Sequence, residues 1–299
     1  MTSESETSTP APTRMSPAAA GAPGRADAAG RSVATTPVAT HGGVALIALG
    51  ILLAAMLLSH SVYSWAWLNV MPQPLVWLVQ PLLAVGLVLV GLAWVYRRDL
   101  GWMLRELGVA APVLLPVAFA AVATLPLAVG FGFGDRPLGT LSIWSLLFTL
   151  TVWPFVWELL FRGYAFRQLH RRAGWGFFSA ALVPPLIFAL VHVGFAFFAD
   201  QDLRIPLLAA GAALLGGLFF SWLFVAWGDN LWAPVAFHGL LNLWWEAFGI
   251  DRDGIGTLGS NLLRGTAVVL AIVLTLFWKR LPAAPRVGGP PAPTGSPTS

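Results

Sequence analysis

Residues 75–96 read LVWLVQPLLAVGLVLVGLAWVY and contain no charged side chain. An apolar run of this length can cross the roughly 30 Å hydrocarbon core of a bilayer as an α-helix. Apolar residues follow one another here instead of alternating with polar ones, which indicates a transmembrane helix rather than a barrel strand. Pro72 and Pro74 precede the run, and an Arg-Arg-Asp triplet at 97–99 follows it. These breaks predict the two ends of one membrane span.

Seven further runs of the same kind lie on both sides of this one, separated by polar or proline-containing breaks. We expect transmembrane segments at 44–64, 75–96, 112–133, 140–166, 177–199, 205–227, 231–249 and 258–278. The sequence therefore predicts an all-α polytopic membrane protein, a bundle of about eight transmembrane helices.

The composition of the 299-residue chain agrees, with 57% hydrophobic and 10% charged residues and a mean hydropathy of +0.76. A soluble protein carries about a quarter of its residues as charges, so a soluble globular enzyme, a nucleic-acid binder and a disordered regulator are excluded. The pI of about 10.3 comes from basic residues in short pairs between apolar runs, as is typical of membrane proteins. Because the chain has no cysteine, disulfides, thiolate metal sites and a cysteine nucleophile are excluded as well.

The basic residues are unevenly divided between the two sides of an eight-helix chain. One side would carry Arg14, Arg25, Arg31, Arg97, Arg98, Arg105, Arg167, Arg171, Arg172, Lys279, Arg280 and Arg286. The other side would carry Arg136, Arg204, Arg252 and Arg264, together with several acidic residues. The positive-inside rule then predicts that both termini lie in the cytoplasm. We expect an integral protein of a bacterial plasma membrane.

The two ends of the chain, residues 1–43 and 282–299, are rich in small residues and Pro and poor in large apolar side chains. Such segments cannot bury a core, so we expect two disordered cytoplasmic tails. They would flank a transmembrane domain at 44–281.

A few strongly polar side chains remain inside the predicted helices. They are Glu158, Arg162, His192, His238, Asn242 and Glu246. A charged group near the bilayer centre costs about 2.5–3.5 kcal/mol on insertion scales, so such groups usually face a polar interior and have a function.

Each of these residues also has a purely structural interpretation. Glu158 and Arg162 are spaced i,i+4 and can form an ion pair that fixes one helix end. His192 could be a hydrogen-bond donor between helices, and His238 with Asn242 could be a structural pair on one helix face. Taken together, a carboxylate, two imidazoles and an amide on three helices favour a site that activates water and stabilises an oxyanion.

The polar residues also form three motifs in order. Residues 157–163, WELLFRG, resemble E-E-x-x-x-R-G, and residues 188–192, FALVH, match F-x-x-x-H. Residues 238–242, HGLLN, resemble H-x-x-x-N. This set resembles the CAAX-protease and bacteriocin-processing (CPBP, or Abi) family of intramembrane proteases, and the resemblance covers about residues 140–245.

The resemblance implies an endopeptidase that cleaves a membrane-associated protein or peptide near the cytoplasmic face. In that family the first glutamate of the doublet and the first histidine are thought to activate a water molecule, so the resemblance implies that His192 is the partner of the water and that His238 and Asn242 hold the oxyanion. Glu158 would join His192 at the water only if it can serve in place of the first glutamate. Arg162 would pair with Glu158 and hold the motif in place. The expected partners are the lipid bilayer and this substrate, with no nucleic acid and no cofactor.

The sequence departs from the family motif at Trp157, where the first of the two glutamates would stand. Neighbouring residues on an α-helix point about 100° apart, so Glu158 cannot take that place unless the helix is rotated or bulged. Pro154 could supply such a kink. Glu246, one turn beyond Asn242, is an alternative base.

Other functions therefore stay open. Trp157 is compatible with a catalytically inactive family member that acts as a membrane binding or immunity protein. A small-solute transporter would also have many apolar helices, but the two halves lack matching broken segments. If a metal were present, Glu158, His192 and His238 would be its ligands, although no metal is expected because H-E-x-x-H is absent.

Overall fold

The computed structural model describes residues 40–64, 73–133, 139, 141–198, 202–250 and 256–280. All of these fall within the unit Thr36–Ser299. The predicted tails lie outside the described residues except at 40–43. There the first helix begins at His41 rather than at Val44, because the carbonyl of Thr40 accepts a hydrogen bond from the Val44 N–H at 2.9 Å.

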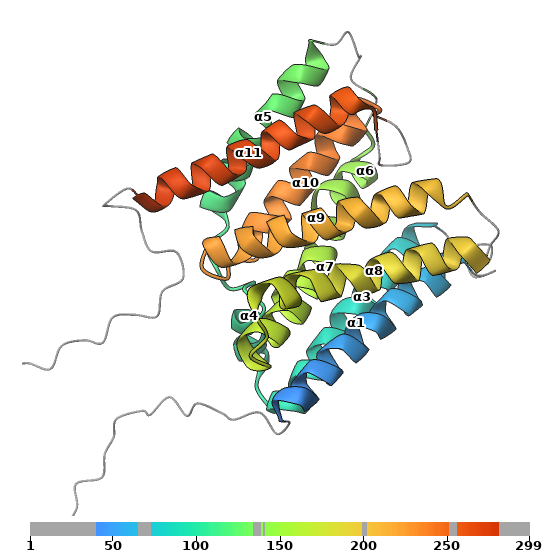
Figure 1. The fold of residues 1–299 in the computed structure, drawn as a ribbon, viewed down its shortest axis with the longest axis vertical. Helices are drawn as coiled ribbons and strands as arrows, with labels where there is room; N and C mark the ends of the chain where they lie inside the picture. The colour runs from blue at the N-terminus through green and yellow to red at the C-terminus, as the bar shows by residue number, and fades with distance from the viewer. Residues whose placement is uncertain are drawn as a thin grey trace, which may run out of the picture. The chain divides into compact units, whose positions relative to one another are not determined.

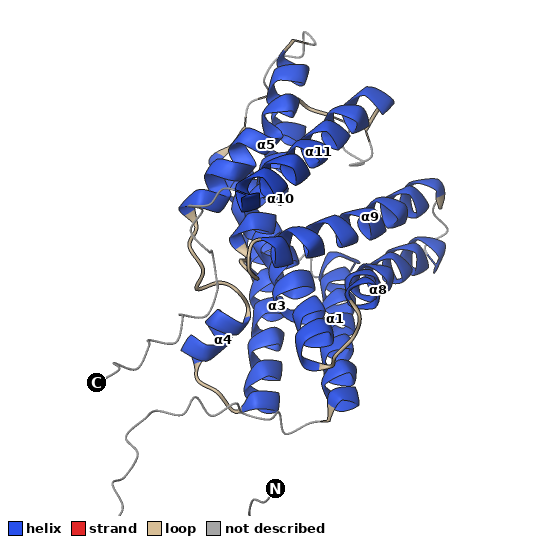
Figure 2. Cartoon of the chain, turned by 60° about the vertical axis from the view of Figure 1, so that its left-hand side comes forward, coloured by secondary structure: helices blue, strands red, loops and turns tan. Residues whose placement is uncertain are grey.

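Every regular element among the described residues is helical, which confirms the all-α prediction (Figures 1 and 2). In chain order the structure contains α1 (His41–Ser64), α3 (Gln73–Tyr96), α4 (Leu100–Glu106), α5 (Leu114–Gly132), α6 (Ile143–Leu147), η1 (Phe148–Val152), α7 (Trp153–Glu158), η2 (Leu159–Phe166), η3 (Gln168–Arg172), α8 (Phe177–Phe198), α9 (Arg204–Ala226), α10 (Trp232–Ala247) and α11 (Leu258–Arg280). The elements named η are π-helical.

Six of the described helices, α1, α3, α5, α8, α9 and α11, are long and apolar enough to cross a membrane. The two remaining predicted segments are those that carry motif residues at 157–163 and 238–242. The fourth segment is divided into short α- and π-helical pieces from α6 to η3, and α10 has 16 residues. Together with the six spans they make up the predicted bundle of about eight helices.

A short helix that the hydropathy pattern did not indicate, α4, lies in the predicted loop 97–111. Asp99 begins it, because its Oδ1 accepts a hydrogen bond from the Trp102 N–H at 2.8 Å, as an N-cap residue does. This hydrogen bond lowers the pKa of Asp99.

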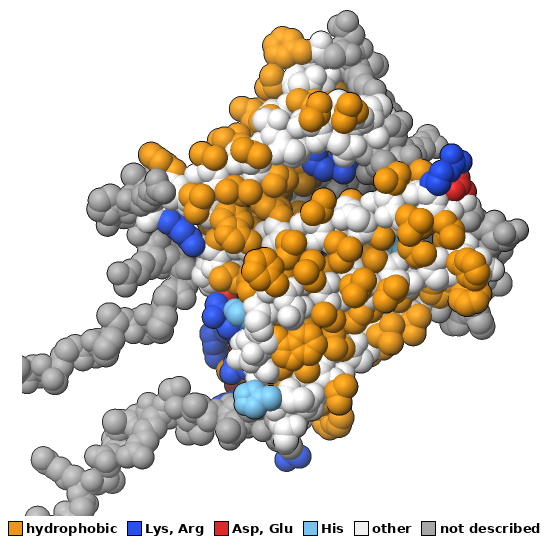
Figure 3. All heavy atoms as spheres, in the orientation of Figure 1, with side chains coloured by type: hydrophobic (Ala, Val, Ile, Leu, Met, Phe, Trp, Pro, Cys, Tyr) orange, Lys and Arg blue, Asp and Glu red, His pale blue; other side chains and the backbone are white. Residues whose placement is uncertain are grey.

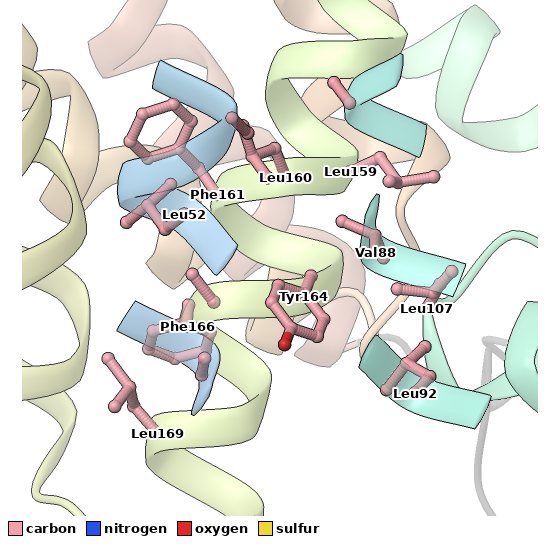
Figure 4. Close-up of a cluster of buried hydrophobic side chains, with 14 of the residues drawn as sticks. Leu52, Val88, Leu92, Leu107, Leu159, Leu160, Phe161, Tyr164, Phe166 and Leu169 are labelled. Atoms are coloured by element: carbon pink, nitrogen blue, oxygen red, sulfur yellow. The ribbon is translucent and has the colours of Figure 1, made fainter. Parts of the chain in front are cut away.

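The helices pack in two neighbouring groups around the fourth segment. α8 lies beside α9, α1 lies beside α3, and α5 packs against both α10 and α11 (Figures 1 and 2). Figure 4 shows the fourth segment between α1 and α3, with Phe161 near Leu52 and Tyr164 near Leu92 and Leu107. The motif-bearing segment therefore lies inside the bundle.

Large apolar side chains are also exposed on the outside of the helices. Leu190 of α8 is 64% exposed and Leu215 of α9 is 72% exposed. In Figure 3 hydrophobic side chains cover the face formed by α8, α9 and α11, and most charged side chains in that view lie at its edges. In water such a surface would be unfavourable, whereas in a bilayer it faces lipid.

The basic loops that were predicted to share one side are in contact. Arg172 donates two hydrogen bonds to the buried carboxylate of Glu106 in α4, at 2.9 and 2.7 Å. Arg167 and Arg171 form ion pairs with Asp229, at 3.5 and 3.3 Å. The loops at 97–111, 167–176 and 228–230 therefore lie at one end of the bundle.

Candidate active site

The fourth helical segment lies close to α10 one turn before Pro154, at Leu150. Proline has no N–H, so it cannot donate an α-helical hydrogen bond to the carbonyl of Leu150. Gly239 of α10 packs against this carbonyl, because a Cβ at Gly239 would lie only 2.2 Å from the Leu150 oxygen. The glycine thus brings its neighbour His238 close to the fourth segment.

A π-helical stretch, η2, begins immediately after Glu158. π-helical hydrogen bonds run from i to i+5 and change the angles between successive side chains relative to an α-helix. Glu158 itself is the last residue of the α-helical α7, so the π-helical pattern changes the directions of the side chains that follow it. Gly163 permits this segment to touch the Leu107 carbonyl, which would lie 2.8 Å from a Cβ at that position.

The start of α10 is fixed by hydrogen bonds from the residues just before His238. The Oδ1 of Asn230 accepts from the Trp232 N–H, and its Nδ2 donates to the Pro112 carbonyl, both at 2.9 Å. The indole N–H of Trp232 donates to the Val109 carbonyl, also at 2.9 Å. These contacts hold the first residues of α10 at the same end of the bundle as the basic loops.

Glu158 is the centre of the site and is fully buried. The Nδ1 of His238 lies 2.7 Å from its Oε1, and the Nη1 of Arg162 lies 3.2 Å from its Oε2. The second contact is an ion pair without hydrogen-bond alignment, since Oε2 accepts no hydrogen bond among the described residues. The carboxylate therefore joins a motif on the fourth segment to a motif on α10.

Two residues of α9 complete this arrangement. Arg162 donates from Nη2 to the Gly216 carbonyl at 3.2 Å, and its guanidinium lies 5.0 Å from the centroid of the Phe220 ring. The same ring stacks on His238, with centroids 5.4 Å apart and planes at 28°. Sequence reasoning missed Gly216 and Phe220, because an apolar residue within an apolar helix carries no distinguishing signal.

His192 of α8 is fixed by contacts within its own helix. Its Nδ1 lies 3.1 Å from the Phe188 carbonyl oxygen, and its ring lies 3.8 Å from the Phe188 ring. In the neutral ring, donation from Nδ1–H to this carbonyl leaves the lone pair on Nε2. That nitrogen can accept a proton.

A cavity of about 330 Å³ joins these groups, and its lining includes Glu158, Arg162, His192 and His238. The fifth predicted residue, Asn242, lines an adjoining cavity of about 530 Å³. Asn242 is not among the residues that line the first cavity. It stands one helical turn, about 6 Å, beyond His238. His238 itself lines both cavities.

Residues 139–244 match the protein-family model described as Type II CAAX prenyl endopeptidase Rce1-like. Over these residues the chain is similar to the CAAX-protease family. The matched residues contain all three motifs and coincide closely with the predicted 140–245, so the resemblance is confirmed. No curated protein and no solved structure matches the chain. The match supports an intramembrane protease of this family.

The family-matched segment departs from the family motif at Trp157, whose side chain forms part of an apolar wall of the first cavity. Trp157 lines that cavity and meets the Phe188 ring edge-on, with centroids 5.8 Å apart and planes at 84°. It also contacts the Phe161 ring, at 5.9 Å between centroids. An aromatic cluster thus occupies the motif position at which the first glutamate is expected.

The sequence left two alternatives for the site: Glu246, just beyond the family-matched residues, as the base, and a metal ion held by Glu158, His192 and His238. Glu246 accepts a hydrogen bond from the hydroxyl of Thr149 and is not among the residues lining either cavity. Within the part of the chain that the structure describes, no three His, Asp or Glu side chains are placed to hold a metal ion. Glu158, His192 and His238 therefore do not form a ligand cluster in this conformation.

Proposed function

We propose that the chain is an intramembrane endopeptidase that hydrolyses a peptide bond of a membrane-associated protein or peptide. The observation that carries this proposal is the 2.7 Å contact between Glu158 and His238, which links two family motifs in a cavity that His192 also lines. The cavity is lined in part by the fourth helical segment, and the end of that segment carries Arg167, Arg171 and Arg172. The positive-inside rule makes that end cytoplasmic.

In this proposal His192 is the general base. With its Nδ1 turned to the Phe188 carbonyl, its Nε2 can accept a proton from a water molecule in the cavity. The water oxygen then attacks the carbonyl carbon of the substrate. This role for His192 agrees with the one that the family resemblance implies.

Glu158 acts through His238 rather than on the water. In the proposed step the imidazolium of His238 donates from Nδ1–H to the Glu158 carboxylate, 2.7 Å away, and from Nε2–H to the developing oxyanion. Asn242, in the adjoining cavity, supplies an amide N–H from the other side. Arg162 holds Glu158 in place and compensates part of its charge.

The proton balance closes within these groups. The tetrahedral intermediate collapses as the carbon–nitrogen bond breaks, and the leaving amine takes the proton that His192 received from water. The products are a carboxylic acid and an amine, which become a carboxylate and an ammonium ion when the acid gives its proton to the amine, and both histidines return to their initial state. No further reactant is required.

A second candidate is a catalytically inactive family member that binds a membrane partner. The aromatic cluster of Trp157, Phe161 and Phe188 favours it, because it places no carboxylate at the first motif position. In that case the buried contacts of Glu158 with Arg162 and His238 would serve only to hold the helices together.

The test is cleavage of a library of membrane-anchored peptides in liposomes, with products identified by mass spectrometry. We expect the wild type to cleave, and Glu158→Gln and His192→Ala to lose activity by roughly 100-fold or more, because positioned proton transfer contributes about 10²–10⁴-fold. His170→Ala is the matched control, since His170 contacts the Trp175 carbonyl outside the cavity.

Activity that survives both Glu158→Gln and His192→Ala would contradict the proposed mechanism. Activity that is absent in the wild type but present in Trp157→Glu would establish the inactive family member instead.

A further inference from the structure

One aromatic side chain of α9, Phe220, contacts both partners of the buried Glu158 carboxylate. Its ring stacks on the ring of His238, with centroids 5.4 Å apart and planes at 28°. The guanidinium carbon of Arg162 lies 5.0 Å from the centroid of the same ring. Because Arg162 and His238 also pair with Glu158, the four side chains form a closed loop of contacts.

The contact with Glu158 alone does not determine the direction of the His238 ring. It holds one ring atom, Nδ1, at 2.7 Å from Oε1, whereas the torsion that turns an imidazole about its Cβ–Cγ bond has broad energy wells. The side chain of His238 is 25% exposed, so its surroundings do not enclose it. The Nε2–H that the proposed reaction needs is therefore aimed only if the plane of the ring is also fixed.

The ring of Phe220 can fix this plane because it is itself held in place. It meets the ring of Phe237 at 6.1 Å between centroids and 67° between planes, which is a favourable aromatic contact. Phe237 is fully buried. Phe220 also lines both cavities, as His238 does. Its ring carries no group that ionises or forms a conventional hydrogen bond, so it can orient a neighbour but cannot transfer a proton.

The aromatic character of Phe220 matters in addition to its volume. A flat ring stacks on an imidazole, and its face attracts a cation within about 6 Å of the centroid. A leucine at this position would fill much of the same space without either interaction. The contacts of Phe220 therefore require an aromatic residue on α9, a helix that carries none of the three family motifs.

We propose that Phe220 is a positioning residue whose ring fixes the plane of His238 so that Nε2–H points to the developing oxyanion. This inference rests on the proposed peptidase function. The oxyanion exists only after water has attacked the substrate carbonyl, so an aimed donor stabilises the transition state and not the bound substrate. Loss of the ring should therefore lower kcat and leave KM nearly unchanged.

The first test compares Phe220→Leu with Phe220→Tyr in the liposome cleavage assay. Removing an oxyanion donor outright costs about 10²–10³-fold in kcat, so a misdirected donor in Phe220→Leu should cost roughly 10- to 100-fold, with KM within about 3-fold of the wild type. Phe220→Tyr keeps the flat ring and should stay within about 3-fold of the wild-type kcat.

Phe224→Leu is the matched control, since it makes the same substitution one turn further along α9. Phe224 is fully buried and is not among the residues lining either cavity. Phe224→Leu should therefore destabilise the fold at least as much as Phe220→Leu and leave kcat unchanged. Wild-type kcat in Phe220→Leu overturns the inference. So does an equal loss of kcat in Phe220→Tyr or in Phe224→Leu.

The second test reports the orientation of the His238 ring without any cleavage. The full-length protein is labelled with ¹³C- and ¹⁵N-histidine, and the His238 ring signals are identified in NMR spectra by their loss in His238→Ala. An aromatic ring shields the nuclei above its face, so the His238 ring protons should move downfield in Phe220→Leu and keep their position in Phe220→Tyr. Unchanged signals in Phe220→Leu contradict the inference.

The two tests together separate this inference from the proposed function. The expected NMR shift without cleavage by the wild type supports the placement of His238 by Phe220 and contradicts the peptidase. Cleavage that Phe220→Leu does not slow supports the peptidase and overturns the positioning role.

Discussion

The buried carboxylate of Glu158 is compensated by partners on both sides of it. Arg162 approaches Oε2 and His238 approaches Oε1, while Phe220 packs against both partners. A buried charge without a partner is strongly destabilising, so the three polar side chains depend on one another for stability as well as for the proposed chemistry.

Replacing Arg162 by Gln should destabilise the folded protein by about 3–5 kcal/mol, because it leaves the fully buried Glu158 charge without its cationic partner. The measurement is the unfolding midpoint in detergent. The double variant Glu158→Gln/Arg162→Gln should recover part of the loss, since neither charge is then left alone. The control is Arg171→Gln, whose side chain is 47% exposed. A loss no larger than that of the control would contradict the prediction.

At the scale of elements, the contact between the fourth segment and α10 sets the geometry of the site. Pro154 cannot donate an α-helical hydrogen bond, and Gly239 fits against the Leu150 carbonyl. The π-helical η2 then follows Glu158. Short irregular helices thus bring Glu158 within 2.7 Å of His238, whereas the six long helices form the surrounding scaffold.

Gly239→Ala should therefore impair the proposed activity by about 100-fold, because its Cβ would push α10 away and misplacing a reacting group by about 1 Å has an effect of this size. Gly194→Ala is the matched control, since a Cβ at this helical position meets nothing within 4 Å. Its stability should be unchanged or increased by up to about 1 kcal/mol. Cleavage rates and unfolding midpoints of both variants decide the matter, and equal rates would refute the prediction.

Hydropathy and residue spacing determine how much of the fold and of the candidate site could be predicted from the sequence. Long apolar runs indicate membrane helices, and the i,i+4 pair of Glu158 and Arg162 indicates a common face, so both were predicted. The π-helical pieces were not predicted, because hydropathy does not encode the register of backbone hydrogen bonds. Helical spacing assigned Asn242 to the face of His238 without showing which neighbouring helix lies opposite each residue. Spacing alone therefore did not show that Asn242 lines the adjoining cavity rather than the first one.

For the whole molecule, the contacts among the loops at 97–111, 167–176 and 228–230 place the basic residues at one end of the bundle. The start of α9, with Asp202 and Arg204, lies on the other side of the predicted topology. If the positive-inside rule holds, the first end is cytoplasmic. This orientation also fixes the side from which the proposed substrate is cleaved.

Because the chain has no native cysteine, single-cysteine variants can report this orientation without background. We expect Asp202→Cys to react with a membrane-impermeant maleimide added to intact cells, and Arg171→Cys to react only after the membrane is permeabilised. Labelling of Arg171→Cys but not Asp202→Cys in intact cells would show the inverse orientation.

The measurement that most directly tests the proposed site is a double-mutant cycle between Glu158 and His238, read as kcat/KM in the liposome cleavage assay. If the two residues act as one unit, Glu158→Gln and His238→Ala each lower kcat/KM by roughly 100-fold or more. The double variant then has a kcat/KM no lower than that of the less active single variant. Losses that multiply, or single variants that keep wild-type activity, would contradict the account.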